Sequence, residues 1–268
     1  MGLIATVSNE PLSIFTDASM IRRVHREGVT LLGGGRALLM QIANPAVAAA
    51  VAEHSSFRAD PLQRLLQTLR PTLAIAFGTR AQVRRAVALI NAVHRKVTGP
   101  GYSATDPALL LWVLATLIDT SLLMHQRFVH PLRPAEAEAY YGDMVLAGRL
   151  LGIPPERIPA GMSAFKTYMG DTMGSLQVSD TARELAAELF RPASPLAPAM
   201  WLLRGLTSGL LPATLREQFE LPWDPVREAS LQVAEKLSRA VVPLLPTLLR
   251  APPPFLMPPT AGRADGAG

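Results

Sequence analysis

The chain has 268 residues, of which 49% are hydrophobic and 18% charged, and its 26 basic and 21 acidic residues give a formal net charge of +5. This composition excludes a disordered or fibrous protein and predicts a large apolar core, because the charged fraction lies below the ~25% of an average soluble domain. The sequence contains no cysteine. Disulfides, thiolate metal sites, iron–sulfur clusters and cysteine nucleophiles are therefore excluded.

The basic excess is almost entirely arginine and is spread along the chain. The densest groups are Arg22, Arg23 and Arg26, and a second cluster within 80–85. Each group falls on a predicted helix turn that faces solvent, and no nucleic-acid reading motif accompanies it. We therefore expect no nucleic-acid partner. A basic DNA-associated regulator is a remaining alternative, and it would require salt-sensitive DNA binding near Arg22.

Two segments bear on membranes and location. Residues 1–15 form an N-terminal segment without the charged and apolar regions of a signal peptide, and we expect a cytoplasmic protein. Residues 107–124 are long and apolar enough to be considered as a membrane span, but they contain Asp119. A carboxylate inside a lone span is costly, so this stretch is predicted to be a buried core helix. We expect no transmembrane span, and at most peripheral membrane contact through apolar patches.

Helical periodicity dominates residues 16–250, and no strand-like alternation is found, so the expected fold is all-α, a single multi-helix domain. Gly33–Gly35 is predicted to form a turn that lets two helices pack closely. The Pro-rich and Gly-rich residues 251–268 are expected to form a disordered tail. The predicted helices begin near Thr16-Asp17, at Ala37 with a break at Asn44-Pro45, at Asp60-Pro61 with an interruption at Pro71, and at Thr79. Later ones begin at Asp106-Pro107 and Arg133-Pro134, and cover 160–173, 181–190, 195–206, 212–219 and 225–248.

His94 replaces an apolar residue in the stripe formed by Val83, Val87, Ile90 and Val97 on the predicted helix 80–97. Its imidazole should therefore point inward among apolar neighbours. Such a histidine is either a satisfied core residue, which is the commoner case, or the proximal ligand of a haem, which needs one helix-borne imidazole in an apolar slot. Zinc is not predicted, because only two of the five histidines are close in sequence and their five-residue spacing does not share a helix face.

A polar group on the preceding helix is the second candidate site. Offsets of three and four residues place Arg64, Gln67 and Thr68 on one face, opposite a leucine ridge. The helix continues into the uncharged run 71–77, which indicates that it enters the core. We therefore expect Arg64 and Thr68 to be buried with partners.

These stretches resemble a known family, the domain shared by rubber oxygenases (latex-clearing proteins) and MpaB-type oxygenases. Three of the matching motifs are Asp60-Pro-Leu-Gln-Arg-Leu-Leu-Gln-Thr, Ala92-Val-His-Arg-Lys-Val-Thr-Gly and Tyr102-Ser-Ala-Thr-Asp-Pro. Others begin at Gly33 and Glu53, and the resemblance spans roughly residues 18–245. The order and spacing of many short motifs carry the similarity, since each motif alone is weak.

The resemblance implies a globin-like core and a b-type haem held by one histidine, with O2 as co-substrate. His94 corresponds to the haem-ligating histidine and is therefore the expected metal ligand. Arg64 and Thr68 correspond to the family's Arg-x-x-Lys-Thr motif near the haem, so Arg64, Gln67 and Thr68 are the expected catalytic residues and Arg64 also a haem contact. Gln67 stands where rubber oxygenases carry lysine. A resting state with lysine bound to the iron is not expected here.

The expected function is thus a haem b-dependent oxygenase that acts with O2 on an apolar small molecule, an isoprenoid or terpenoid. The alternative is a non-catalytic helical protein that holds haem or lipid. Asn44 and Leu114 stand where many relatives carry histidine, which predicts a less polar site and a different substrate. Asp119 and Asn91 are candidates for the acceptor that the second nitrogen of a ligating imidazole usually needs.

Overall fold

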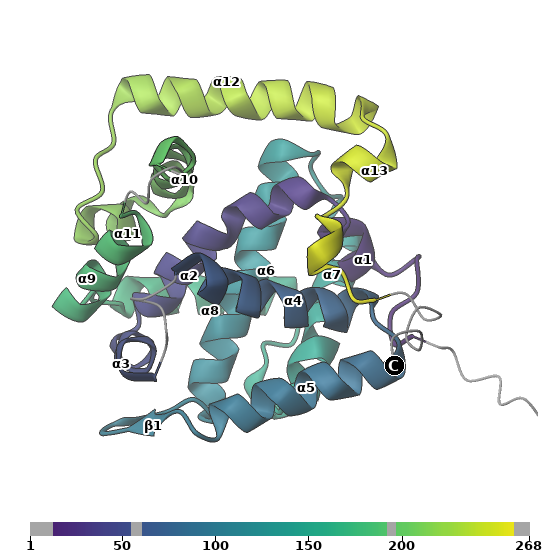
Figure 1. Cartoon of the computed structure of the whole chain (residues 1–268), viewed down its shortest axis with the longest axis vertical. Coiled ribbons are helices and arrows are strands. Elements are labelled where there is room, and N and C mark those ends of the chain that lie inside the picture. The colour runs from purple at the N-terminus through teal and green to yellow at the C-terminus, as the bar shows by residue number, and fades with distance from the viewer. Residues whose placement is uncertain (1–12, 55–60, 192–196, 260–268) are drawn as a thin grey trace, which may run out of the picture.

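A computed structural model describes residues 13–54, 61–191 and 197–259, with side chains omitted for 61–67, Ala197 and Ala199. The described chain is helical apart from one short hairpin, which confirms the all-α fold class. Figure 1 shows α12 across one end of the molecule and α5 across the opposite end, with α2 and α6 between them. The N-terminal helices are α1 (Met20–His25), α2 (Gly34–Ile42), α3 (Pro45–His54), α4 (Pro61–Phe77), α5 (Arg80–His94) and α6 (Pro107–Phe128). The later ones are α7 (Pro134–Leu150), α8 (Met162–Ser175), α9 (Asp180–Leu189), α10 (Ala197–Leu210), α11 (Ala213–Gln218), α12 (Pro225–Val241) and α13 (Thr247–Arg250).

Helix α6 is the centre of the fold. Asp106 caps it by accepting a hydrogen bond from the Ala108 amide at 2.8 Å, with Pro107 at the first helical position, as predicted. Among the described helices, α6 is long and apolar enough to cross a membrane by length and composition. It packs against α2, α7 and α12, and its buried residues include Trp112, Ile118 and Met124. The prediction of a core helix is confirmed.

The three consecutive glycines allow close helix packing, but they do not break the chain into a loop. Gly33 ends a 3-10 helix, η1 (Gly28–Gly33), and Gly34 starts α2 directly. A Cβ atom on Gly33 would lie 2.7 Å from Met124 Cγ of α6, and one on Gly35 would overlap Thr207 Oγ1 of α10. The predicted close approach is therefore present on two sides of this segment.

Gly35→Ala is expected to lower the free energy of unfolding by about 1–3 kcal/mol, because the added methyl group overlaps a fully buried threonine. Urea denaturation of the purified protein measures the change. In a Thr207→Ala background, which removes the overlapping hydroxyl, the same substitution should cost clearly less. An equal cost in both backgrounds would mean that the overlap is not the cause.

Several predicted helix boundaries differ from the structure. Helix α1 begins at Met20, after Ser19 rather than at Thr16-Asp17, and the helix predicted over 225–248 ends at Val241. Helix α4 continues through Pro71, and beside it the Thr72 hydroxyl donates to the Thr68 carbonyl oxygen at 2.9 Å. Helix α5 ends at His94 rather than at Val97, because a short hairpin follows. The break at Asn44 is confirmed, with Asn44 Oδ1 accepting from the Ala46 amide at 3.0 Å at the start of α3.

The C-terminal segment packs against the domain over the part of the expected tail that the structure describes, up to Pro259. Residues 254–256 form a 3-10 helix, η5, that packs on α4, and Leu256 is only 4% exposed. Gln82 Nε2 donates to the Pro259 carbonyl oxygen at 2.7 Å, and Arg250 forms an ion pair with Glu27. Residues 260–268 lie outside the described residues.

Arg22 is not in solvent, contrary to the sequence prediction. Its Nε donates to the Ala76 carbonyl oxygen at 3.0 Å and its Nη2 to that of Phe77 at 3.1 Å. These are carbonyl groups of the last turn of α4, which an α-helix leaves without intrahelical donors. Arg22 therefore fixes the end of α4 to α1, and it is occupied within the protein rather than available to an external anion.

Burial lowers the pKa of His25 to about 4, and its Nε2 lies 3.2 Å from the Tyr140 hydroxyl. An unfolded histidine titrates near 6.5. Stability that depends on the neutral imidazole is therefore complete above that pH and is lost as the pH falls toward 4. Between pH 7 and pH 5 the free energy of unfolding should fall by about 2 kcal/mol through this group, and His25→Gln should remove that part of the fall. Urea denaturation of wild type and His25→Gln at the two pH values measures this difference. The same fall in both proteins would contradict the prediction.

Candidate functional site

Helices α4 and α5 form a tight helical hairpin that carries all the site residues predicted from the sequence. Only Gly78 and Thr79 separate them, and the two helices pack against each other. Thr79 and Gln82 form a reciprocal capping box: the Thr79 amide donates to Gln82 Oε1 at 2.8 Å, and the Gln82 amide donates to Thr79 Oγ1 at 3.3 Å. The predicted start of α5 at Thr79 is thus confirmed.

His94 is the last residue of α5, and it is half-buried. It lies on the same helix face as Val83, which is 1% exposed, and as Val87 and Ile90, which are partly buried against the core. The predicted apolar stripe is therefore the core-facing side of α5. Its burial decreases toward His94, so the imidazole sits at the edge of the core rather than deep within it.

An exposed apolar row runs beside His94. Leu89 and Val93 are one helical turn apart and are 62% and 52% exposed, on the flank of α5 about 100° around the helix from the row formed by Ile90 and His94. A flat apolar group bound at His94 would cover these side chains and remove their surface from water, which is favourable. His94, at the end of the apolar stripe of α5, is of the residue type that can serve as the single protein ligand a haem needs.

A short β-hairpin that follows α5 connects the end of this helix to α3. Strands β1 (Thr98–Gly99) and β2 (Tyr102–Ser103) pair antiparallel. The Tyr102 hydroxyl donates to Glu53 Oε2 at 2.6 Å, and His54 Nε2 lies 3.0 Å from the Thr98 carbonyl oxygen. These contacts fix the chain that follows His94. Two-residue strands are too short to leave an alternating pattern, which is why the sequence did not predict them.

Arg64, Gln67 and Thr68 all lie on α4, the helix packed against α5. Thr68 is half-buried, and its carbonyl oxygen accepts the bond from Thr72. The side chains of Arg64 and Gln67 lie outside the described residues. The structure thus brings the two helices together, while the roles of these three side chains stay predictions.

A buried arginine that the sequence did not single out connects three helices. Arg36 of α2 is 4% exposed; it donates to Asp119 Oδ2 and to Thr120 Oγ1 on α6, each at 2.6 Å, and to the Leu210 carbonyl oxygen of α10 at 2.8 Å. Asp119 was one of the two candidates for the second acceptor of His94, and its observed partner is Arg36 instead. This leaves Asn91, which is half-buried on α5, as the other candidate.

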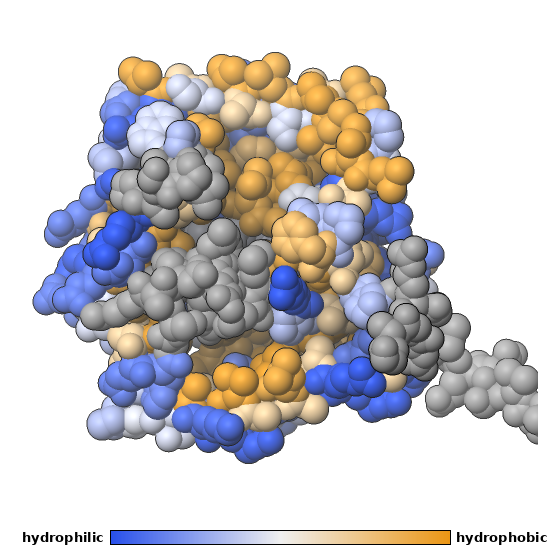
Figure 2. Space-filling model, in the orientation of Figure 1, coloured by the Kyte–Doolittle hydropathy of each residue, from blue (hydrophilic) through white to orange (hydrophobic). Residues whose placement is uncertain are grey.

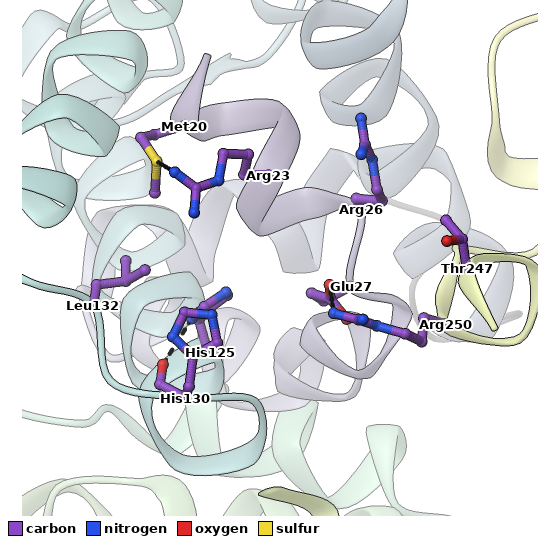
Figure 3. Close-up of a pocket in the computed structure, with 9 residues that line it drawn as sticks. All are labelled: Met20, Arg23, Arg26, Glu27, His125, His130, Leu132, Thr247 and Arg250. Atoms are coloured by element: carbon purple, nitrogen blue, oxygen red, sulfur yellow. Dashed lines mark hydrogen bonds and ion pairs between the residues drawn. The ribbon is translucent and has the colours of Figure 1, made fainter. Parts of the chain in front are cut away.

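A separate cavity of about 210 Å3 lies between α1, the end of α6 and α13. In Figure 3, the Glu27–Arg250 pair and the two histidines, His125 and His130, lie on opposite sides of it. Arg23 and Arg26 also line it. The lining is polar, and the volume is below the ~300 Å3 at which ligand pockets usually begin. This cavity suits neither a haem nor an apolar substrate.

The histidine pair in that cavity is held by backbone contacts. His125 Nδ1 lies 2.9 Å from the His130 carbonyl oxygen, and burial lowers the pKa of His125. Within the described ranges, no three histidine or acidic side chains are grouped so that they could hold a metal ion. A haem iron differs in needing only one protein ligand, because the porphyrin supplies four nitrogens.

Comparison with known proteins bears on the fold first. The chain is similar to a solved structure of the latex clearing protein LCP in its closed state, with a TM-score of 0.60, 18% sequence identity and 84% of this chain covered. The match spans 65% of that protein's chain. This likeness supports the fold.

Sequence relatives and a family comparison then define the family. Uncharacterized proteins of Mycobacterium bovis and Mycobacterium tuberculosis are each 28% identical over 229 residues, covering 78% of this chain and 87% of theirs. Residues 21–241 match the family described as ER-bound oxygenase mpaB/B'/Rubber oxygenase, catalytic domain. The matched range contains every predicted site residue and most of the helical domain, and the chain therefore belongs to this oxygenase family.

Proposed function

We propose that the protein is a haem b-dependent oxygenase that acts with O2 on an apolar isoprenoid or terpenoid substrate. The proposal rests above all on one observation. His94, which the family resemblance predicts to be the haem ligand, lies at the edge of the core at the end of the apolar stripe of α5, and the exposed side chains of Leu89 and Val93 lie on the flank of the same helix. An imidazole at that place can reach a group lying outside the core, and the apolar row beside it would shield one side of that group from water.

The site residues of the α4–α5 helical hairpin have different roles in this proposal. His94 would hold the haem iron, and the bound haem would supply the site at which O2 is activated. Arg64 would pair with a propionate carboxylate, because a guanidinium can donate two parallel hydrogen bonds to it. The Gln67 amide and the Thr68 hydroxyl would act as hydrogen-bond donors toward the bound molecules. Leu89 and Val93 would exclude water.

Gln67 distinguishes this chain from rubber oxygenases. A neutral amide is a poor iron ligand, whereas a lysine amine can reach the iron from the distal side. No side-chain amine at this position would therefore hold the iron in the resting protein. Purified wild type is expected to bind an added small ligand such as imidazole without a preceding conformational step.

The proposed function is tested by spectroscopy and by oxygen uptake. Full-length protein is purified, titrated with hemin and examined for a Soret band with one equivalent bound. Oxygen consumption is then measured with squalene and with short polyisoprene oligomers as probes. Haem binding with substrate-dependent oxygen uptake is the expected result. Failure to take up hemin contradicts the proposal, and haem binding without oxygen uptake by any probe indicates the non-catalytic alternative.

A further inference from the structure

The outward face of α12 is apolar. Val226, Val233, Leu237 and Val241 are 75%, 56%, 59% and 49% exposed. Their spacing of seven, four and four residues places them on one side of the helix, in a row about 22 Å long at 1.5 Å per residue. Figure 2 shows hydrophobic atoms along the top edge of the molecule, over α12. An amphipathic surface helix normally turns its apolar side toward the protein core and its polar side toward water.

The other side of α12 is fixed to the protein, so this orientation is not arbitrary. Leu231 and Glu235 are each 7% exposed, and Glu235 pairs with Arg127 of α6 at 2.5 Å. The Ser238 hydroxyl donates to the Phe128 carbonyl oxygen at 2.7 Å. Rotating the helix to bury its apolar row would break these contacts. The row is therefore held outward by the fold.

The apolar surface continues beyond the end of α12. Leu244 and Leu248 are 83% and 90% exposed, and Leu249 is 71% exposed. In Figure 2 hydrophobic atoms extend from the top edge to the upper right, over α13. We call the set of Val226, Val233, Leu237, Val241, Leu244 and Leu248 the α12–α13 surface. Trp201 of α10, the helix packed on α12, is a further large exposed apolar side chain, at 71%.

The charges around this surface are basic. Within the described residues 221–259, Lys236 and Arg239 are exposed cations, whereas Arg227 pairs with Asp224 at 3.1 Å and both of these side chains are 45% exposed. The carboxylates of this stretch are occupied locally. Asp224 caps α12, and Glu228 accepts a hydrogen bond from Trp223. An apolar row flanked by cations complements a surface with an apolar interior and anionic groups at its boundary.

We propose that the α12–α13 surface docks the protein peripherally on membranes that contain anionic lipids. The apolar row would enter the acyl boundary, while Lys236 and Arg239 would contact the headgroups. A second copy of the chain is the poorer occupant, because a symmetric contact would bring the same cations together. The proposal concerns a surface separate from the α4–α5 hairpin and holds with or without haem.

Vesicle co-sedimentation of the full-length protein tests the proposal. Wild type is expected to sediment with phosphatidylcholine vesicles containing phosphatidylglycerol, and less with phosphatidylcholine alone. Val233→Glu with Leu237→Glu should weaken binding at least tenfold, since each removes an inserted apolar side chain. Lys236→Glu with Arg239→Glu should remove the preference for anionic vesicles, at about fivefold per cation. Leu146→Glu on α7, a leucine that is 41% exposed on another helix, is the matched control and should bind as wild type.

Two results would overturn it. The first is wild-type protein that remains in the supernatant with both kinds of vesicle, because it would then not bind membranes at all. The second is a wild type that does not bind vesicles and forms a stable dimer, detected by light scattering after gel filtration, which Leu237→Glu converts to a monomer. All variants lie on the surface, and circular dichroism confirms that they are folded before they are compared.

Discussion

His94→Ala is expected to abolish stoichiometric hemin binding and the Soret band, and with them any oxygen uptake. The reason is that the proposed site has one protein ligand to the iron, so no second side chain can compensate. His94 is half-buried at the end of a helix, and the substitution should leave the fold intact. Absorption spectra after hemin titration and gel filtration measure the loss.

Two controls make the His94 result specific. His130→Ala removes an exposed histidine at the separate polar cavity and should leave hemin binding unchanged. His94→Gly leaves room for an external ligand, and added imidazole should restore the Soret band. If His94→Ala bound hemin with the wild-type spectrum and affinity, His94 would not be the ligand and the assignment would fail.

Arg36→Met is expected to lower the free energy of unfolding by about 3 kcal/mol. Removing one partner of a buried ion pair leaves the other charge without compensation, which typically costs 3–5 kcal/mol. The low end applies because the Asp119 side chain is 31% exposed and can be partly solvated. The change also removes a donor from the Leu210 carbonyl oxygen. Urea denaturation followed by circular dichroism measures it.

The matched control is Arg133→Met. This arginine is 81% exposed and pairs with Glu136 on α7, and an exposed pair of this kind contributes little to stability, so the substitution should leave the free energy of unfolding nearly unchanged. Replacing Asp119 by leucine in the Arg36→Met background should recover part of the lost stability, since no buried charge then remains unpaired. A stability equal to wild type for Arg36→Met alone would show that the network does not hold α2, α6 and α10 together.

Local chemistry explains why the helix starts could be predicted. Asp106, Thr79 and Asp224 all cap the helices predicted to begin after them, because each needs only the amides two or three residues ahead. The apolar stripe of α5 was equally accessible, since a period of 3.6 residues is visible within fifteen residues. These features depend on neighbours in the sequence.

Contacts between distant segments were not predictable in the same way. Arg22 binds carbonyl groups 54 and 55 residues away, and Arg36 binds Asp119 at a separation of 83 residues. The sequence around each arginine does not indicate its partner. A buried arginine and a solvent-exposed arginine therefore cannot be told apart from the local sequence. The order of residues 251–259 was missed for a similar reason, because Leu256 finds its buried position only against α4.

The candidate site also combines features that local sequence predicts with features that it does not. Periodicity placed His94 on the apolar face of α5, but it left open both a core histidine, the commoner case, and a haem ligand. The family resemblance favoured the haem ligand, which stays a prediction, and the match over residues 21–241 shows the family. The exposed row of Leu89 and Val93 could not be predicted, because which flank of a broad apolar face is covered depends on the whole packing arrangement.

The C-terminal segment has a consequence for the order in which the protein folds. The Arg250–Glu27 pair joins residues 223 positions apart, and Pro259 accepts a bond from Gln82 of the capping box. Contacts of such long sequence separation carry a large loop-closure cost and form late. During synthesis, α1, α4 and α5 emerge long before this segment can reach them. The hairpin that carries His94 is therefore expected to remain open on one side until the last part of the domain has been translated.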